Sequence, residues 1–129
     1  MSLFIEGLVT FLSNSGTTAA DRVWPMKVPQ GEDLPGITYK LISDPGEPTH
    51  SGPSSLRHPR FQLDCWGNNY LEAATLADEV ISRMDGYKGL MGGTLVHASF
   101  LEDARDNNDP ETGRHWLSVD VIIWQKKPV

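Results

Sequence analysis

Residues 70–84 contain the feature that most constrains the fold, a continuous apolar stripe at helical spacing. The stripe consists of Ala73, Leu76, Ala77, Val80, Ile81 and Met84. This spacing follows the 3.6-residue period of a helix, so these side chains share one face. Asn69 and Glu72 form a capping-box pattern at the start, and Asp85-Gly86 supplies a stop. Because the opposite face is charged, the sequence predicts a helix that packs one side on a sheet.

A second amphipathic helix is predicted over residues 2–13. Ser2 is a good N-cap, and apolar residues recur at helical spacing from Phe4 to Leu12. Strand-like segments cover residues 22–25, 37–43, 56–66, 90–102 and 115–125. In the last segment Leu117, Val119, Val121 and Ile123 are expected on the buried face.

These elements predict one α+β domain over residues 1–129, a length that suits a single core. We expect a mainly antiparallel sheet of four to five strands with two helices packed on it. Two polar stretches, about 44–55 and 104–113, are predicted as flexible loops. The first holds three prolines and two glycines with almost no apolar residue. Loops this long in a small domain are usually functional or mobile.

Charge excludes two classes of partner. The chain has 11 Lys and Arg against 17 Asp and Glu, a formal net charge of −6. A sequence-nonspecific nucleic-acid binder needs a basic face, and so does a protein that docks on an anionic membrane. The first basic residue is Arg22, so the start lacks the basic segment of a secretory signal, and no apolar run approaches transmembrane length. We therefore expect an intracellular protein without a membrane partner.

No metal or cofactor site is expected. The four histidines and Cys65 match no zinc-ligand spacing, and one cysteine cannot form an intramolecular disulfide. The acidic stretch 102–111 fails as a calcium-binding EF-hand, because the twelfth ligand position falls on Leu117 or Arg114. A hairpin tip kept soluble by charge explains this stretch, and a divalent ion bound weakly between chains remains an alternative.

Catalysis is not expected either. The sequence contains no nucleophile elbow, phosphate-binding loop or dinucleotide-binding glycine motif. Cys65 lies in an alternating apolar strand, a position typical of a core thiol rather than a reactive one. The prediction is a protein without catalytic residues.

Large aromatic residues on the second face of the last strand are the distinctive feature that remains. Trp116, Ile122 and Trp124 alternate with the predicted core residues, and Trp66 lies in a neighbouring strand. Aromatic side chains are enriched as anchors at protein interfaces. Two interpretations stay open: this face is buried against another chain, or one helix covers each face of the sheet within the monomer.

Several segments resemble, in order, the tail completion proteins of long-tailed bacteriophages and prophages, also described as tail terminator or head-tail joining proteins. The resemblance rests on residues 22–25 (RVWP), 34–39 (LPGITY) and 60–67 (RFQLDCWG), on Tyr70 with Glu72-Ala73, and on the closing strand up to Trp124. It spans nearly the whole chain. The departures lie mainly in the loops.

The resemblance implies a structural virion protein that forms a ring, taken as a hexamer, on the head-proximal end of the tail tube. There it would end tube polymerisation and join the tail to the head. The implied partners are other copies of the chain, the tail tube protein and the head connector or adaptor. DNA would only pass through the lumen, and assembly would take place in the cytoplasm of a host bacterium.

A ring closed by rotation needs two different complementary patches on each chain. The candidate interface residues are Trp66, Trp116, Ile122, Trp124, Pro48, His50, Asp106, Asp109 and Glu111. Alternative functions are a head-tail adaptor, a tail tube subunit, or a small metal-dependent enzyme or binding domain. The last would need a concave pocket with convergent polar groups, for instance His97 and Cys65 close to a carboxylate.

Overall fold

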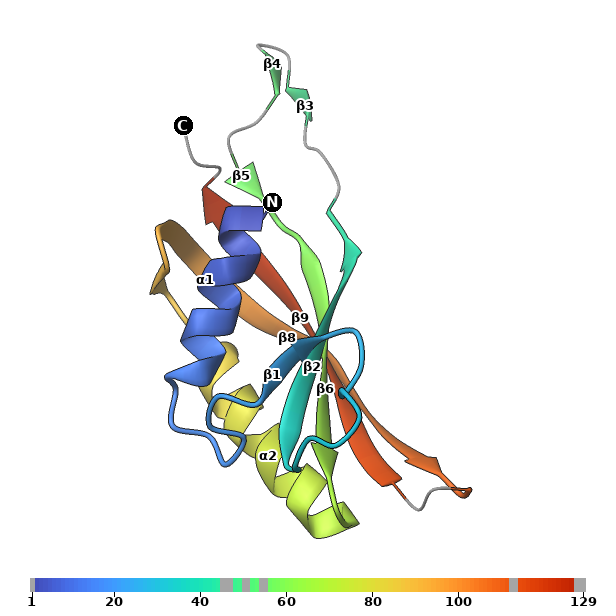
Figure 1. The fold of residues 1–129 in the computed structure, drawn as a ribbon. Coiled ribbons are helices and arrows are strands. Elements are labelled where there is room, and N and C mark those ends of the chain that lie inside the picture. The colour runs from blue at the N-terminus through green and yellow to red at the C-terminus, as the bar shows by residue number, and fades with distance from the viewer. Residues whose placement is uncertain (1, 45–47, 50–51, 54–55, 112–113, 127–129) are drawn as a thin grey trace.

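The computed structural model describes residues 2–44, 48–49, 52–53, 56–111 and 114–126 (Figure 1). These residues form two α-helices, α1 (Ser2–Ser13) and α2 (Tyr70–Met84). The strands are β1 (Val23–Pro25), β2 (Gly36–Ser43), β3 (Pro48–Thr49), β4 (Gly52–Pro53), β5 (Leu56–Arg57), β6 (Arg60–Gly67), β7 (Gly89–Met91), β8 (Thr94–Asp109) and β9 (Arg114–Lys126).

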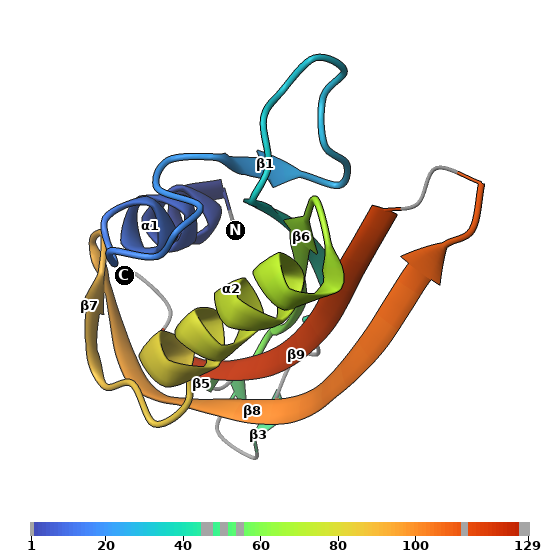
Figure 2. The same cartoon turned by 90° about the horizontal axis from the view of Figure 1, so that it is seen from below.

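Both helices lie on the same face of the sheet. Figure 2 shows the sheet curling around α2, with α1 beside it on the same side. The predicted stripe of α2 packs on the buried side chains of β6 and β9, and its N-terminus is capped by Asn69, which accepts the Glu72 N–H at 2.9 Å. The ring of Phe4 in α1 lies 5.8 Å from the ring of Phe61 in β6. The core is therefore one layer between the helices and a single sheet face.

The main sheet has the order β1-β2-β6-β9-β8-β7 in the described residues, and β5 also pairs with β9. The pairing of β1 with β2 is parallel, and the other pairings are antiparallel. The predicted α+β class with two helices packed on a sheet is confirmed. The expected four to five strands were too few, because the short strands β1, β5 and β7 extend the sheet and β1 makes it mixed. The interpretation that places one helix on each face is wrong.

The acidic stretch predicted as the loop 104–113 is mostly strand. β8 continues to Asp109, and β9 begins at Arg114, with partners matched from Ala104–Val119 to Asp109–Arg114. A register shift between Leu101 and Asp103 marks a β-bulge at Glu102. Polar composition disfavours strands only weakly, and a paired neighbour overrides it here. Within the predicted loop 44–55, β3 and β4 pair with each other, while residues 45–47, 50–51 and 54–55 lie outside the described residues.

The backbone of α1 lies directly on the turn between β7 and β8. A Cβ atom at Gly7 would lie 2.9 Å from the carbonyl carbon of Met91, and one at Gly92 would lie 2.8 Å from the Cα of Gly7. Gly92 has φ near +60°, which glycine adopts without strain. Two glycines thus permit a backbone-to-backbone contact that anchors α1.

Substitution Gly7→Ala tests this contact. Alanine favours a helix over glycine by about 1 kcal/mol, yet the added methyl overlaps Met91. We expect a net loss of about 1–3 kcal/mol in the free energy of unfolding, as for other overpacked sites. Urea denaturation measures it, with the exposed Glu6→Ala in the same helix as control. A Gly7→Ala protein more stable than wild type would show that the contact is loose.

Candidate functional site

The face of the sheet opposite the helices, called the open face below, is the candidate functional site. Among the described residues no helix covers it. It carries alternate side chains of β2, β6, β8 and β9, while the residues between them point into the core. The open face divides into an aromatic row, a polar network and a second aromatic group.

The aromatic row crosses the sheet at one end of β6. The rings of Trp66 and Trp116, directly opposite each other in β6 and β9, stack at 4.5 Å with an interplanar angle of 22°. The indole Nε1–H of Trp66 donates to Thr38 Oγ1 at 2.9 Å, which fixes its orientation. Trp24 of β1 lies over Gly36, where a Cβ would come within 2.8 Å of Trp24 Cη2. All three indoles are half-buried, so they present a rigid apolar surface to a partner.

The second aromatic group lies toward the other end of β9. Trp124 stacks on His58 with ring centroids 4.4 Å apart. Ile122 is half-buried, and Phe100, its neighbour in β8, is 49% exposed. The structure therefore pairs Trp66 with Trp116 but places Trp124 in a separate group of the same face.

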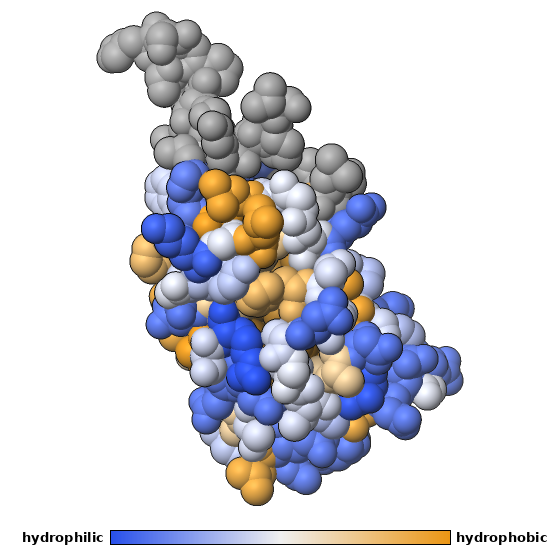
Figure 3. All heavy atoms as spheres, turned by 90° about the vertical axis from the view of Figure 1, so that its left-hand side faces the viewer, coloured by the Kyte–Doolittle hydropathy of each residue, from blue (hydrophilic) through white to orange (hydrophobic). Residues whose placement is uncertain are grey.

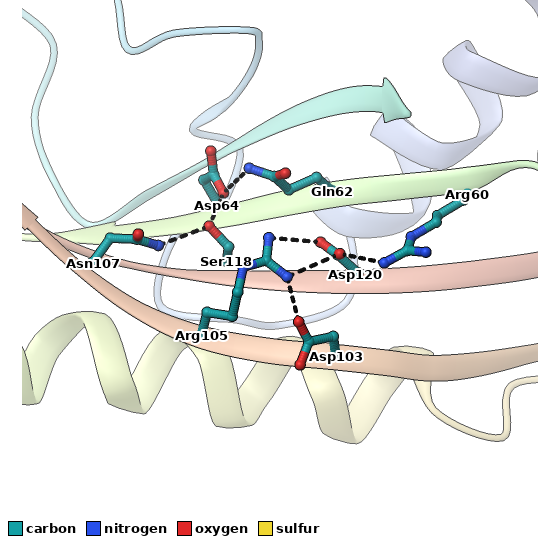
Figure 4. Close-up of polar contacts among 8 residues, drawn as sticks. All are labelled: Arg60, Gln62, Asp64, Asp103, Arg105, Asn107, Ser118 and Asp120. Carbon is teal, nitrogen blue, oxygen red and sulfur yellow. Dashed lines mark hydrogen bonds and ion pairs between the residues drawn. The ribbon is translucent and has the colours of Figure 1, made fainter. Parts of the chain in front are cut away.

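Between these groups lies a polar network (Figure 4). The buried Ser118 hydroxyl donates to Asp64 Oδ1 at 2.7 Å and accepts from Asn107 Nδ2 at 3.0 Å. Gln62 Nε2 donates to the same Asp64 oxygen at 2.9 Å. The chain of bonds links β6, β9 and β8, so these polar groups are satisfied within the protomer.

Asp120 is the centre of the charged part of the network. Asp120 is 4% exposed, and its carboxylate accepts hydrogen bonds from Arg60 Nη2 at 2.9 Å and from Arg105 Nη1 at 3.0 Å. Arg105 also bonds Asp103 (Figure 4). Burial by itself would raise the pKa of Asp120, but the hydrogen bonds and charges of Arg105 and Arg60 together lower it below its usual value. Asp120 is therefore held as a carboxylate that ties three strands together.

The remaining predicted interface residues scatter. Asp106 lies in β8 and accepts from the Tyr70 hydroxyl at 3.2 Å, a bond that raises the pKa of Tyr70. Asp109 ends β8, and its carboxylate accepts the N–H of the exposed Glu111 at 3.0 Å. Asp106 and Asp109 are thus strand residues, and their placement in a flexible loop is wrong.

Two other predicted interface residues come from the stretch 44–55. Pro48 lies in the short hairpin of β3 and β4, and His50 falls outside the described residues.

The groups considered for metal or thiol chemistry do not converge. Cys65 is fully buried in the core, where desolvation raises the pKa of its thiol, while His97 is exposed. In the part of the chain that the structure describes, no three His, Cys, Asp or Glu side chains gather in a metal-binding arrangement. The described helices include none with the length and apolar character needed to cross a membrane.

The family model described as "Tail completion protein gp17" matches residues 9–126. The chain belongs to this tail completion family. The match includes β1, β2, β6, α2, β8 and β9, and thus every strand of the open face. The protein is accordingly a structural component of a phage-type tail, as the resemblance in the sequence predicts.

Solved structures share the fold of this tail completion family member. A chain of the "Virion of native gene transfer agent (GTA) particle" superimposes with a TM-score of 0.60 at 12% sequence identity. The superposition covers 97% of this chain and 92% of that chain. A comparison with curated proteins gave no match.

Sequence reasoning about this tail completion chain missed the polar network and Trp24. Ser118 and Asp120 occupy alternate positions between Trp116 and Ile122, so the strand pattern already placed them on the open face. Their partners in β6 and β8 depend on strand register, which alternation within one strand does not specify. Trp24 could be assigned to a strand but not to the row, because the parallel β1–β2 pairing was not foreseen.

The lowered pKa of Asp120 predicts an acid-sensitive contribution to stability. The pKa of an unfolded Asp is about 3.9, and the pKa of Asp120 in the folded protein is lower. The contribution of this ion pair to the free energy of unfolding is therefore fully present above the unfolded pKa and is lost as the pH falls through the folded pKa. We expect Asp120→Asn to lower the free energy of unfolding by about 1–3 kcal/mol at neutral pH and by less at about pH 3. Urea denaturation at both pH values measures this, with the exposed Asp78→Asn as control. An equal loss at both values would contradict the ion-pair account.

Proposed function

We propose that this chain assembles as a closed ring, a hexamer, on the head-proximal end of a tail tube. There it ends tube polymerisation and provides the surface that joins the head connector or adaptor. The observation that carries the proposal is the open face, an uncovered sheet face with two aromatic groups in a chain of the tail completion family. The role is structural rather than catalytic.

The open face supports assembly because its aromatic surface is already ordered. Trp66, Trp116 and Trp124 are held by stacking within the protomer, so little side-chain entropy is lost when a partner covers them. A ring closed by rotation uses different patches on the two sides of each contact. The two aromatic groups, at opposite ends of β9, offer such patches for a neighbouring copy, the tube protein or the connector.

Charge supports a passive role toward DNA. With a net charge of −6, an acidic lumen would repel phosphates and allow DNA to pass without sticking. Assembly would precede head joining, in the cytoplasm of the host bacterium. A density map of the ring that shows a basic lumen would refute this part of the proposal.

Light scattering across a concentration series, with electron microscopy of the protein added to tail tubes, tests the function. We expect discrete rings at high concentration and density at one end of each tube, with tube growth stopped. Long cylinders of the protein alone would instead identify a tube subunit. Failure to bind tubes or to form rings would refute the proposal.

Removal of one indole should weaken assembly more than folding. We expect Trp116→Ala and Trp124→Ala each to raise the concentration needed for half-assembly by about tenfold or more, as for aromatic interface anchors. Analytical ultracentrifugation measures assembly, and thermal melting of the monomer measures stability. Leu71→Ala, which removes an apolar side chain 75% exposed on α2, is the control. A large loss of monomer stability with unchanged assembly would assign these indoles to the core.

A further inference from the structure

The sheet has two open backbone edges, one on each side. β1 covers β2 only at Ile37–Tyr39, so residues 40–43 have no strand on their outer side among the described residues. At the opposite edge, β7 pairs with β8 only at Thr94–Val96. The adjoining segment binds Ser99 through Tyr87 and Gly86 backbone groups, and Leu101 through Asp85 Oδ1. Residues 103–108 of β8 have no such neighbour in the described structure.

The ladder shows which backbone groups of β8 point outward. The N–H of Ile123 in β9 donates to the carbonyl of Pro59, the residue just before β6. Backbone groups alternate in direction along a strand, so odd-numbered residues of β9 bond toward β6 and even-numbered ones toward β8. Arg105 lies opposite Ser118, and its backbone therefore bonds to β9. Ala104 and Asp106, on either side of it, direct their N–H and C=O groups outward.

The same argument applies to β2. Ile37 donates its N–H to Arg22, and Tyr39 accepts from the N–H of Met26, so odd-numbered residues direct their backbone away from β6. Leu41 is the next in this series and lies beyond the end of β1. The N–H and C=O groups of Leu41 therefore point outward and can pair with another strand. The side chains at this edge are also accessible, since Leu41 is 37% exposed and Ile42 is 43% exposed.

The two edges differ in charge. Lys40 is exposed on the β2 edge, and the exposed Lys27 follows Met26, the residue bonded to Tyr39. The β8 edge carries the exposed carboxylates Glu102 and Asp106. Its one arginine, Arg105, already binds Asp103 and Asp120. Pairing β8 with β2 joins opposite charges, whereas pairing β8 with β8 or β2 with β2 joins like charges.

Strand direction also suits this pairing. Three antiparallel pairings, β2–β6, β6–β9 and β9–β8, separate the two edges, so β8 runs opposite to β2 within one protomer. Rotation about an axis along the strands preserves their directions. A neighbouring β2 would therefore meet β8 in antiparallel orientation, the more stable arrangement.

We propose that the outer edge of β8, residues 103–108, pairs as an antiparallel ladder with the outer edge of β2, residues 40–43, of a second copy of this chain. The contact is head-to-tail, because each copy gives one edge and receives the other, and repetition with rotation closes a ring. The inference deepens the proposed ring function and rests on it. The open face would then form a continuous surface across neighbouring copies.

Proline substitution at outward positions tests the ladder. Ala104→Pro and Leu41→Pro remove an N–H that points away from the protomer's own sheet, a position where edge strands accept proline. Each should raise the concentration for half-assembly by at least about tenfold, since a backbone hydrogen bond is lost and the edge is blocked. Ala104→Val and Leu41→Val keep the N–H and should assemble like wild type. Circular dichroism and thermal melting confirm that the monomers are folded.

Mixing the two proline variants distinguishes the head-to-tail contact from a symmetric one. The Leu41→Pro chain keeps a free β8 edge, and the Ala104→Pro chain keeps a free β2 edge. We expect each variant alone to be monomeric and the mixture to stop at a one-to-one dimer by light scattering with size-exclusion chromatography. Dimers of Leu41→Pro alone would instead show β8–β8 pairing and overturn the proposal.

Charge reversal provides a variant that leaves the backbone unchanged. Lys40→Glu should weaken assembly, because it replaces a positive charge on the β2 edge that faces the acidic β8 edge, and added salt should reduce the difference from wild type. Unchanged assembly of a folded Lys40→Glu chain at low salt would contradict the pairing of these edges.

The outcomes separate the ladder from the ring function. Rings that form with wild-type concentration dependence in both proline variants would overturn the edge pairing and leave the ring function standing. A wild-type chain that stays monomeric at every concentration and on tail tubes would overturn both.

Discussion

The two-sided pairing of β9 is the constraint on which the rest of the structure depends. This strand bonds to β6 on one side and to β8 on the other over most of its length. Its alternate side chains then have to satisfy two environments at once. Val119, Val121 and Ile123 fill the core under α2, and the residues between them build the open face. Register at β9 therefore determines both the stability of the domain and the chemistry of its exposed side.

The open face shows how one face of a sheet can remain uncovered without binding other apolar surfaces nonspecifically. Its centre is occupied by Asp120, two arginines and the Ser118 network, all bonded across strands. Apolar groups are confined to the two ends of the face. A partner that covers the aromatic groups gains apolar contact, while an unrelated apolar surface would have to desolvate the charged centre. Figure 3 shows a different side of the molecule, the one nearest α1. This side is largely hydrophilic, with apolar side chains gathered toward its upper part.

The sequence was sufficient for α2, α1, the α+β class and the inward face of β9, because each follows from a periodicity within one segment. It was insufficient for Asp106 and Asp109, whose polar composition indicated a loop although β9 holds them in a strand. It also could not show that both helices share a face, since that depends on the strand order. In the candidate site, the pairing of Trp66 with Trp116 depends on the register between two strands that are separated by 46 residues of sequence, 68–113. The assignment of all these residues to an interface stays a prediction.

The stacked pair of Trp66 and Trp116 has an optical consequence. Two indoles held nearly parallel in contact couple their electronic transitions, so the pair gives a circular dichroism signal that neither ring produces alone. A slip of one residue between β6 and β9 would send one indole to the core face and abolish the coupling. The chain thus carries an intrinsic spectroscopic reporter of the register of its central strands, readable in the free protein and in an assembled particle.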